Sequence, residues 1–315
     1  DNYQEQPVEV LAHRTSPTNM GLSLLASLSA YDFGYTSSGQ LLTRTTNTMQ
    51  TMQELERYRG HFYNWYHTQT LQPLFPKYVS AVDSGNLAGH LLTLQQGLLA
   101  IPGQKIINER LFEGIGTTLE VIEDVAGNNN HSSLQELRKI LNDTDENIPH
   151  TLSGIHRILT QLATVVVTFM QEAVPDEQPD TFFWKERLQY QVNDALQDLE
   201  TLAPRIKGTG IPENDPELVT MDQVPTLQEL ANAGAAKAME RMNIIEKLAA
   251  QCTALSDMEY LFLYDKSKHL LRIGYNVEEQ RLDAGYYDLL ASEARLCNFV
   301  AIAQGKLPQE SWFAL

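Results

Sequence analysis

Apolar residues along most of the chain recur every three or four positions, which is the period of a helix with one buried face. The clearest series steps alternately by four and three residues: Ile148, Leu152, Ile155, Leu159, Leu162, Val166 and Phe169. This spacing predicts a helix with a coiled-coil-like seam, which packs against a partner helix or against another part of the same chain.

Capping and breaking residues divide the remaining helical pattern into separate segments. In the first hundred residues we predict helices from Thr18 or Asn19 to Gly34, from Ser37 or Ser38 to Gly60, and from Asn86 to Ile101 with Asp83 or Ser84 as its cap and Pro102 as its end. In the middle of the chain, helices are predicted at about 179–202 and 226–252, separated by a Pro- and Gly-rich loop at 207–225.

The period changes to that of a strand near Met258. Residues 260–264 and 269–275 flank the polar turn 265–268, which predicts a β-hairpin, and a last helix is predicted at 284–303. The chain is therefore expected to be mainly α, and paired helices of this kind suit an α/α toroid. We divide it into N-terminal helices at 1–102, a helical insertion with the seam at 103–256, and the hairpin and final helix at 257–315.

Charge and composition narrow the classes of partner. A net charge of −17 and a pI of about 4.8 would repel a phosphate backbone, so no nucleic-acid partner is expected. Cys252 and Cys297 lie in apolar helical segments, which favours buried free thiols. The longest apolar runs, such as 162–170, are too short to span a bilayer. The chain begins without Met, and we expect a fragment of a longer protein.

Aromatic and short polar residues gather in one segment that a core helix would not require. Four rings fall within residues 62–66, and an Asp-Ser-Gly-Asn turn follows at 83–86. Rings can cover the C–H faces of a pyranose while Asn, Asp and Ser bind its hydroxyls, so this segment predicts a sugar-binding cleft; the alternative is an aromatic cluster that closes the core.

Two further polar clusters are candidates for chemistry. The segment 13–19 reads as a binding loop or a capping turn, and 274–288 is dense in carboxylates and Tyr. Glycoside chemistry needs two facing carboxyl groups, and the local candidates are Asp83, Glu278, Asp283 and Asp288. No nucleotide-binding, nucleophile-elbow or metal motif occurs, so neither a metal nor a cofactor is expected.

Four segments together resemble one family. They are HRTSPTN at 13–19, ERYRGHFYNWY at 56–66, LQPLFPKYVSAVDSGNLAGHL at 71–91 and IGYNVEEQRLDAGYYDLLASEARL at 273–296. They are similar to the glucoamylase-like region of cyclic β-1,2-glucan synthases, over about 1–102 and 257–315. The chain resembles the N-terminal portion of that ring-closing, transglycosylase domain.

The resemblance implies a multidomain parent enzyme at the cytoplasmic face of the inner membrane, with this chain itself soluble. The parent would polymerise glucose from UDP-glucose and close the chain into a ring. It further implies an incomplete α/α toroid of the six-hairpin type, with β-1,2-glucan and the remaining domains of the synthase as partners. The Ser-Met-Phe-Glu-Tyr-type and Ile-Ser-Glu-type segments, where the family's acid and base are expected, do not occur here. Catalysis by this chain alone is therefore not expected, and its catalytic residues stay unassigned.

The residues that the resemblance carries over are candidates for the lining of a glucan cleft. They are Asn64, Trp65, Tyr66, Asp83, Ser84, Asn86, Tyr275, Asn276, Glu278, Arg281, Asp283, Tyr286, Tyr287 and Asp288. Two alternatives are a non-catalytic helical module that assembles as a homo-oligomer through the 148–169 seam, and a stand-alone β-glucan hydrolase with a carboxylate pair inside this chain.

Overall fold

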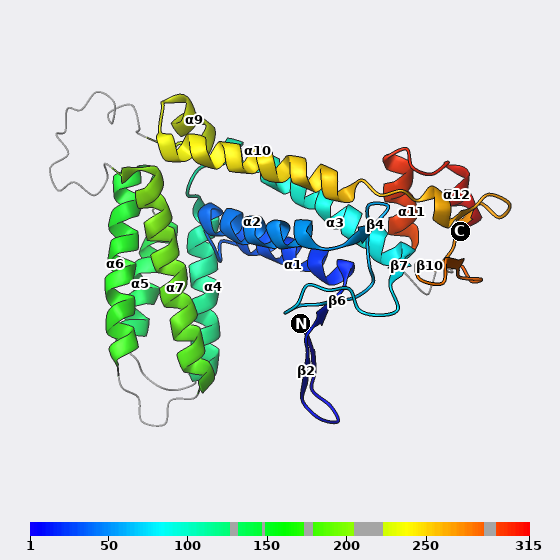
Figure 1. Ribbon diagram of the computed structural model, residues 1–315. Helices are drawn as coiled ribbons and strands as arrows, with labels where there is room; N and C mark the ends of the chain where they lie inside the picture. Colours follow the sequence, from blue (N-terminus) through cyan, green and yellow to red (C-terminus); the bar gives the residue numbers. More distant parts are fainter. Residues whose placement is uncertain (127–131, 147–148, 173–178, 205–222, 287–293) are drawn as a thin grey trace. The chain divides into compact units, whose positions relative to one another are not determined.

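The computed structural model describes residues 1–126, 132–146, 149–172, 179–204, 223–286 and 294–315 (Figure 1). The fold is mainly helical with a few small sheets, which confirms the predicted class. The chain divides into two compact units. Unit 1 contains Asp1–Ser27, Arg44–Leu99 and Glu246–Leu315, and unit 2 contains Leu28–Thr43 and Ala100–Ile245.

The first helix, α1 (Pro17–Asp32), begins earlier than the caps Thr18 and Asn19 predicted. Ser16 is the cap, because its Oγ accepts the backbone N–H of Asn19 at 3.2 Å. Pro17 then occupies the first helical position, where its missing N–H is not needed. The Thr18 side chain is thereby left free to bond elsewhere, which matters for the site described below.

Helix α3 (Ala81–Ala100) also begins earlier than predicted, so Asp83 and Ser84 lie inside its first turns. The cap is supplied by Ser80, whose Oγ accepts the backbone N–H of Asp83 at 3.2 Å. Asp83 was therefore wrong as a cap. Helix α2 (Ser38–Glu54) begins as predicted, with Ser37 Oγ accepting the Gln40 N–H at 3.1 Å, but it ends before Gly60.

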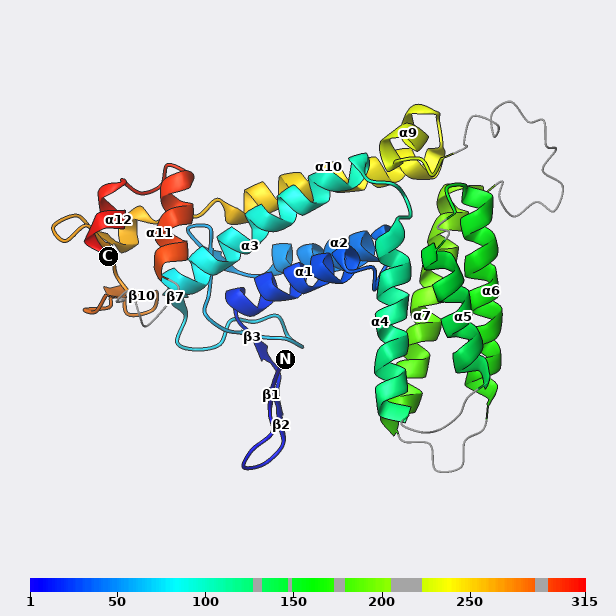
Figure 2. The same cartoon turned by 180° about the vertical axis from the view of Figure 1, so that it is seen from behind.

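Unit 2 is built around four neighbouring helices, which both views show side by side (Figures 1 and 2). They are α4 (Glu109–Ala126), α5 (Ser132–Glu146), α6 (Leu152–Gln171) and α7 (Pro179–Leu202). Each packs against its neighbours, and one continuous apolar core joins all four.

The predicted seam lies on α6 and faces the interior of this bundle. Leu159, Leu162 and Phe169 are fully buried, and Leu152, Ile155 and Val166 are nearly so, whereas Ile148 lies outside the described residues. The seam therefore packs against other parts of the same chain. Among the described residues, α6 is the one helix whose length and hydropathy would suffice to cross a membrane, a property that buried core helices share.

The helix predicted at 226–252 is interrupted. The structure has α9 (Leu227–Asn232), which follows a capping box of Thr226 and Glu229, and then α10 (Ala236–Ser256). Gly234 lies between them with φ of +83°, a conformation that a β-carbon disfavours. The apolar period continues across this break, which is why the pattern alone predicted one helix. Most of the loop predicted at 207–225 lies outside the described residues.

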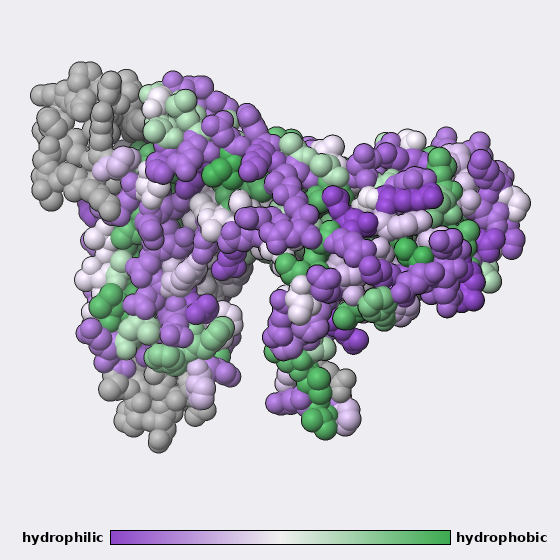
Figure 3. Space-filling view, in the orientation of Figure 1, coloured by the Kyte–Doolittle hydropathy of each residue, from purple (hydrophilic) through white to green (hydrophobic). Residues whose placement is uncertain are grey.

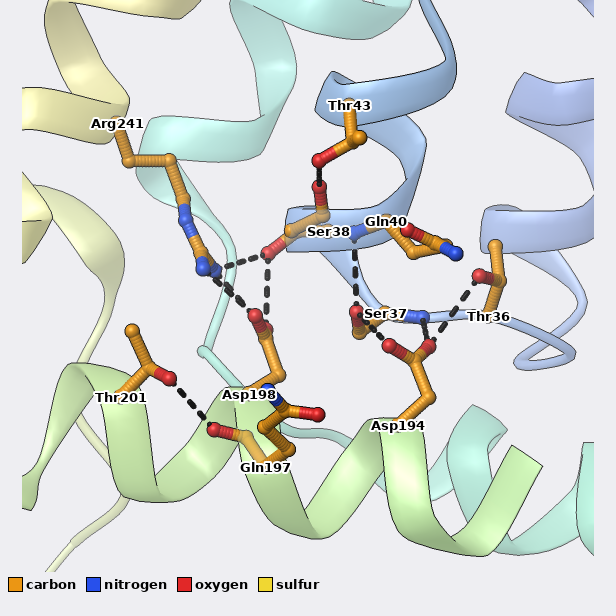
Figure 4. A network of polar contacts seen from close by, with 11 residues as sticks. Thr36, Ser37, Ser38, Gln40, Thr43, Asp194, Gln197, Asp198, Thr201 and Arg241 are labelled. Carbon is orange, nitrogen blue, oxygen red and sulfur yellow. Dashed lines mark hydrogen bonds and ion pairs between the residues drawn. The ribbon is translucent and has the colours of Figure 1, made fainter. Parts of the chain in front are cut away.

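A buried polar network connects α2, α7 and α10 within unit 2 (Figure 4). Arg241 forms two hydrogen bonds with the carboxylate of Asp198, from Nη1 to Oδ2 at 2.9 Å and from Nη2 to Oδ1 at 2.6 Å. Asp194, one turn earlier on α7, accepts the backbone N–H of Ser37 at 2.8 Å and its hydroxyl at 3.0 Å. Both carboxylates thus face the N-terminal end of α2, where the helix dipole favours negative charge.

The strands are short and all pair in antiparallel fashion. Two-stranded sheets join β1 (Asn2–Gln4) with β2 (Val10–Ala12), β3 (Arg14–Thr15) with β6 (Tyr66–His67), β4 (Arg57–Tyr58) with β5 (His61–Phe62), and β8 (Tyr264–Asp265) with β9 (Leu270–Leu271). A three-stranded sheet has the order β11 (Arg281–Leu282), β10 (Gly274–Asn276), β7 (Tyr78–Ser80). The β1–β2 hairpin exposes Tyr3, Val8, Val10 and Leu11 (Figure 3).

The predicted C-terminal hairpin is present but much shorter than expected. Residues Leu261–Leu263 form a 3-10 turn instead of a strand. In a strand, Tyr260 and Leu263 would point to opposite faces, whereas here both side chains are buried. Tyr264 pairs with Leu271 in the two-residue ladder that remains. The segment 274–276 leaves this hairpin and pairs with β7, a long-range contact that no local pattern specifies.

The last helices are α11 (Ala294–Ala303) and α12 (Glu310–Ala314). The predicted start at Ala284 was wrong: residues 284–286 are not helical, and 287–293 lie outside the described residues. Cys252 and Cys297 are buried free thiols, as predicted, and burial raises the pKa of each to about 12. Gly85 packs so closely on α11 that a β-carbon there would lie 2.3 Å from Cys297 Cβ.

Candidate functional site

The segment between β5 and β6 is anchored on both sides. β6 pairs with β3, which directly precedes α1, and the backbone N–H of Asn64 donates to the carbonyl of Tyr78 on β7 at 2.7 Å. Because α3 follows β7 without a gap, the side chains of Asn64 and Trp65 are brought beside the first turns of α1 and α3.

Five side chains from these elements form a hydrogen-bonded group, here called the Asp83 network. Thr18 Oγ1 donates to Asp83 Oδ1 at 2.6 Å, and Asn86 Nδ2 donates to Thr18 Oγ1 at 3.2 Å. In the amide orientation that satisfies both of its neighbours, Asn64 donates from Nδ2 to Asp83 Oδ2 at 2.9 Å and accepts from Trp65 Nε1 at 3.2 Å. The network therefore joins a carboxylate, two amides, a hydroxyl and an indole.

The network is partly open to solvent. Asn64, Trp65 and Asp83 are half-buried, whereas Asn86 is 4% exposed. The guanidinium of Arg14 lies 4.8 Å from the centroid of the Trp65 ring, the geometry of a cation–π contact. A partly exposed ring beside polar side chains of fixed orientation is the chemistry that a sugar-binding surface requires.

Besides the buried Asn86, two predicted site residues lie in the interior, outside the Asp83 network. Tyr66 is 1% exposed, and its hydroxyl donates to the Glu56 carbonyl at 2.6 Å and accepts the Tyr63 N–H at 2.8 Å. Burial raises the pKa of Tyr66 well above its ordinary value. These bonds connect the start and the end of the aromatic segment. Tyr66 therefore supports the alternative in which the aromatic cluster closes the core.

Ser84 is also 1% exposed and lies beside the fully buried His61. Its Oγ is 2.8 Å from His61 Nδ1 and 2.7 Å from the Ser80 carbonyl oxygen, so its single hydrogen serves one of these acceptors at a time. His61 Nε2 lies 2.7 Å from the carbonyl of Glu259. Because a carbonyl only accepts, Nε2 carries the imidazole hydrogen. This Ser–His pair has no solvent access, so it stabilises the fold and does not present a nucleophile.

A second group of predicted site residues lies on β10 and β11. The Tyr275 ring stacks on Tyr58 at 5.7 Å with an interplanar angle of 18°, and Phe262 meets it edge-on at 5.5 Å. The Asp283 carboxylate accepts the hydroxyl of Tyr78. Because β10 pairs with β7, and β7 leads directly into α3, this group is linked through the sheet to the helix that carries Asp83.

The polar residues of this second group form hydrogen bonds and an ion pair with one another in the turn between β10 and β11. Asn276 Oδ1 accepts the backbone N–H groups of Glu278 and Glu279, both at 3.1 Å, which forms a tight turn. Arg281 forms an ion pair with Glu279 at 2.7 Å. Glu278, Glu279 and Arg281 are exposed, so their charged groups stay hydrated.

Tyr286 belongs to a third group. Its hydroxyl donates to Asp265 Oδ2 at 2.5 Å, and the cations of Lys268 and Arg272 lie 4.5 and 4.6 Å from its ring centroid. Hydrogen bonds from Ser267 hold the pKa of Asp265 well below its ordinary value, with further contributions from Tyr286 and Arg272. The Tyr286 ring is thus taken up by contacts within the chain. Tyr287 and Asp288 lie outside the described residues.

No protein-family model matches the chain. Over its whole length, the chain is 32% identical to the cyclic β-(1,2)-glucan synthase NdvB of Rhizobium meliloti (strain 1021). This chain matches part of that synthase. It spans 11% of the length of the relative, so the match extends from end to end of this chain and covers a small part of the larger enzyme. In the described part of the chain, no three His, Cys, Asp or Glu side chains converge as metal ligands would.

Sequence reasoning missed Arg14, Thr18, Tyr58 and Phe262. Arg14 and Thr18 lie in the candidate segment 13–19, in which the helical pattern predicts Thr18 as a cap. The Ser16–Pro17 pair is the signal that places Thr18 inside the helix. Pro favours the first helical position, so the preceding Ser becomes the cap. No signal near Tyr58 indicates contact with Tyr275, because the two residues are far apart in the sequence. Phe262 and Tyr275 lie on the two arms of the predicted hairpin, so the pattern offered a signal for that contact.

Proposed function

We propose that this chain is the glucan-binding portion of a cyclic β-1,2-glucan synthase and contributes to ring closure by transglycosylation. The single observation that carries the proposal is the Asp83 network, in which the half-buried Trp65 ring lies beside the carboxylate and amide of Asp83 and Asn64. The end-to-end match to part of such a synthase supports the same conclusion.

The chemistry of the network suits a glucan chain. The indole face would cover the axial C–H groups of a glucose ring, and the oxygens of Asp83 and Asn64 would accept its hydroxyl hydrogens through the lone pairs that the network leaves open. In the complete domain, a carboxylic acid outside this chain would protonate the leaving glycosidic oxygen. An acceptor hydroxyl would then attack in place of water.

The proposal includes the architecture and setting of the parent. The paired helices of this chain would form part of an α/α toroid whose remaining helices, with the acid and base, belong to the rest of a membrane-bound synthase. The assembly alternative is less well supported, because the apolar residues of the α6 seam are already buried inside unit 2. The hydrolase alternative is less well supported. Among the described candidate carboxylates, Asp83 and Asp283 accept from the hydroxyls of Thr18 and Tyr78, and the exposed Glu278 accepts the backbone N–H of Lys77 at 3.4 Å.

Calorimetric titration of the chain with linear β-1,2-glucooligosaccharides tests the proposal, with β-1,3- and β-1,4-glucans as controls. We expect selective binding of the β-1,2-linked ligand, and Trp65→Ala should weaken it about tenfold because one stacked ring is lost. Trp312→Ala is the matched control, since the Trp312 ring also lies under an arginine, Arg295, at 4.7 Å.

Equal binding of all three glucans, or of none, would contradict the proposal. So would an equal loss of affinity in the Trp65→Ala and Trp312→Ala variants. Circular dichroism and thermal unfolding should show that both variants stay folded, because both rings are only partly buried. A Trp65→Ala chain that unfolds while its residual folded fraction binds normally would assign Trp65 to the core.

A further inference from the structure

Both oxygens of the Asp83 carboxylate are engaged, and each by a different part of unit 1. Oδ1 accepts from Thr18 of α1 at 2.6 Å, and Oδ2 accepts from Asn64 of the β5–β6 segment at 2.9 Å. Asn64 also bonds to Trp65, because its amide oxygen accepts the indole N–H at 3.2 Å. An unbroken series of hydrogen bonds therefore runs from Thr18 through Asp83 and Asn64 to the ring of Trp65.

The direction of each bond in this series is determined by its neighbours. Asn86 donates to the Thr18 oxygen at 3.2 Å, so the hydroxyl hydrogen of Thr18 points to Asp83. The ionised carboxylate only accepts, so the amide nitrogen of Asn64 must face it. The amide oxygen of Asn64 is then turned to Trp65, whose indole nitrogen only donates.

The series is not explained by helix capping. Ser16 caps α1 and Ser80 caps α3, so neither Thr18 nor Asp83 is required at a helix end. A threonine inside a helix usually bonds its own backbone, but Thr18 reaches 65 positions along the chain to Asp83. These side chains therefore do something other than terminate their helices.

We infer that Thr18 and Asp83 are positioning residues that hold the Trp65 ring, through Asn64, in the orientation that stacks on a pyranose. This inference rests on the proposed function. Arg14 covers one face of the indole at 4.8 Å, so a glucose ring would stack on the opposite face. Asp83 consequently acts as a fixed acceptor, and the acid and base of the reaction are supplied by other groups.

The test uses the indole N–H resonances of the 15N-labelled 315-residue chain, which contains three tryptophans. Trp65→Phe assigns the resonance of Trp65, and the resonances of Trp184 and Trp312 are internal controls. Thr18→Val removes the hydroxyl at nearly constant volume, whereas Thr18→Ser retains it. A positioning role predicts that Thr18→Val and Asp83→Asn shift the Trp65 resonance upfield and speed its solvent exchange, and that Thr18→Ser restores the wild-type signal.

Glucan affinity is measured on the same variants. Loss of a hydrogen bond to a charged group should weaken binding of β-1,2-glucooligosaccharides about tenfold in Thr18→Val, with the affinity recovered in Thr18→Ser. A Trp65 resonance that stays unchanged in both Thr18→Val and Asp83→Asn would overturn the inference, even if the glucan binds. A wild-type chain that binds no glucan would instead refute the proposed function, while the indole resonance still decides whether the series orients Trp65.

Discussion

His61 should make unit 1 sensitive to mild acid. The imidazole is fully buried, Nε2 donates to the Glu259 carbonyl, and the ring contacts Tyr260 and Phe262 edge-on at 5.1 and 5.5 Å. Burial lowers the pKa of His61 from 6.5 to about 4, because a charged imidazolium would lose its hydration. The folded state therefore binds a proton less readily than the unfolded chain.

The size of the effect follows from this difference. Each pKa unit corresponds to about 1.4 kcal/mol, so neutral His61 contributes about 3 kcal/mol to the free energy of unfolding. The contribution is fully present above pH 6.5 and falls as the pH drops, with most of it lost at pH 4.5 and all of it below the folded-state pKa. This is a large share of the stability of an ordinary domain.

Urea unfolding at a series of pH values between 7.5 and 4.5 measures the effect. The perturbation is His61→Gln, which does not titrate but retains an N–H donor toward Glu259. We expect the wild type to lose about 2–3 kcal/mol more than this variant over that range. His269→Gln is the matched control at an exposed histidine and should follow the wild type.

Equal losses in the wild type and in His61→Gln would refute the reasoning. An NMR titration that finds the His61 ring protonating near pH 6.5 in the folded chain would refute it directly. Because the comparison is between variants of one chain, protonation of the many Asp and Glu residues cancels from the difference.

Three further outcomes are expected from urea unfolding. Gly85→Ala should destabilise the chain by about 1–3 kcal/mol, because its β-carbon would overlap α11. Gly116→Ala, at a position on α4 with open space around it, should instead stabilise the chain by about 0.5–1 kcal/mol. Similar effects of the two substitutions would contradict the close packing of Gly85. Arg241→Met should lower the unfolding free energy by about 3–5 kcal/mol, because it leaves the buried carboxylate of Asp198 without its ion pair. Adding Asp198→Leu to the same chain should recover much of this loss. Additive losses would show that the two residues act independently. Burial raises the pKa of Asp194, so the stability linked to its proton is present below about pH 4 and is lost as the pH rises through the folded-state pKa. The difference in unfolding free energy between the wild type and Asp194→Asn should therefore fall between pH 4 and pH 7. A rise of this difference would refute the raised pKa.

The predictions that succeeded rest on short-range patterns. The 3-and-4 spacing of apolar residues identified α6. The helical spacing of Leu188, Val192, Leu196 and Leu199 likewise predicted α7, in which three of these residues are buried and Leu196 is partly buried. The helix starts were less well predicted, because several polar residues in succession could each act as the cap. Ser16 and Ser80 take that role. The Ser16–Pro17 pair is a local signal for the first cap, whereas the path of β7 into α3 decides the second.

The residue types of the candidate site can be predicted from local composition, because rings and short polar side chains are in excess at 61–66 and 83–86. Which of these residues meet depends on how the elements pack in three dimensions. Trp65 and Asp83 are brought together through Asn64 and Thr18, while Tyr66 and Ser84 from the same segments are directed into the core. Periodicity indicates only which face of an element is buried, whereas a hydrogen bond between residues 65 positions apart depends on how α1, β7 and α3 pack.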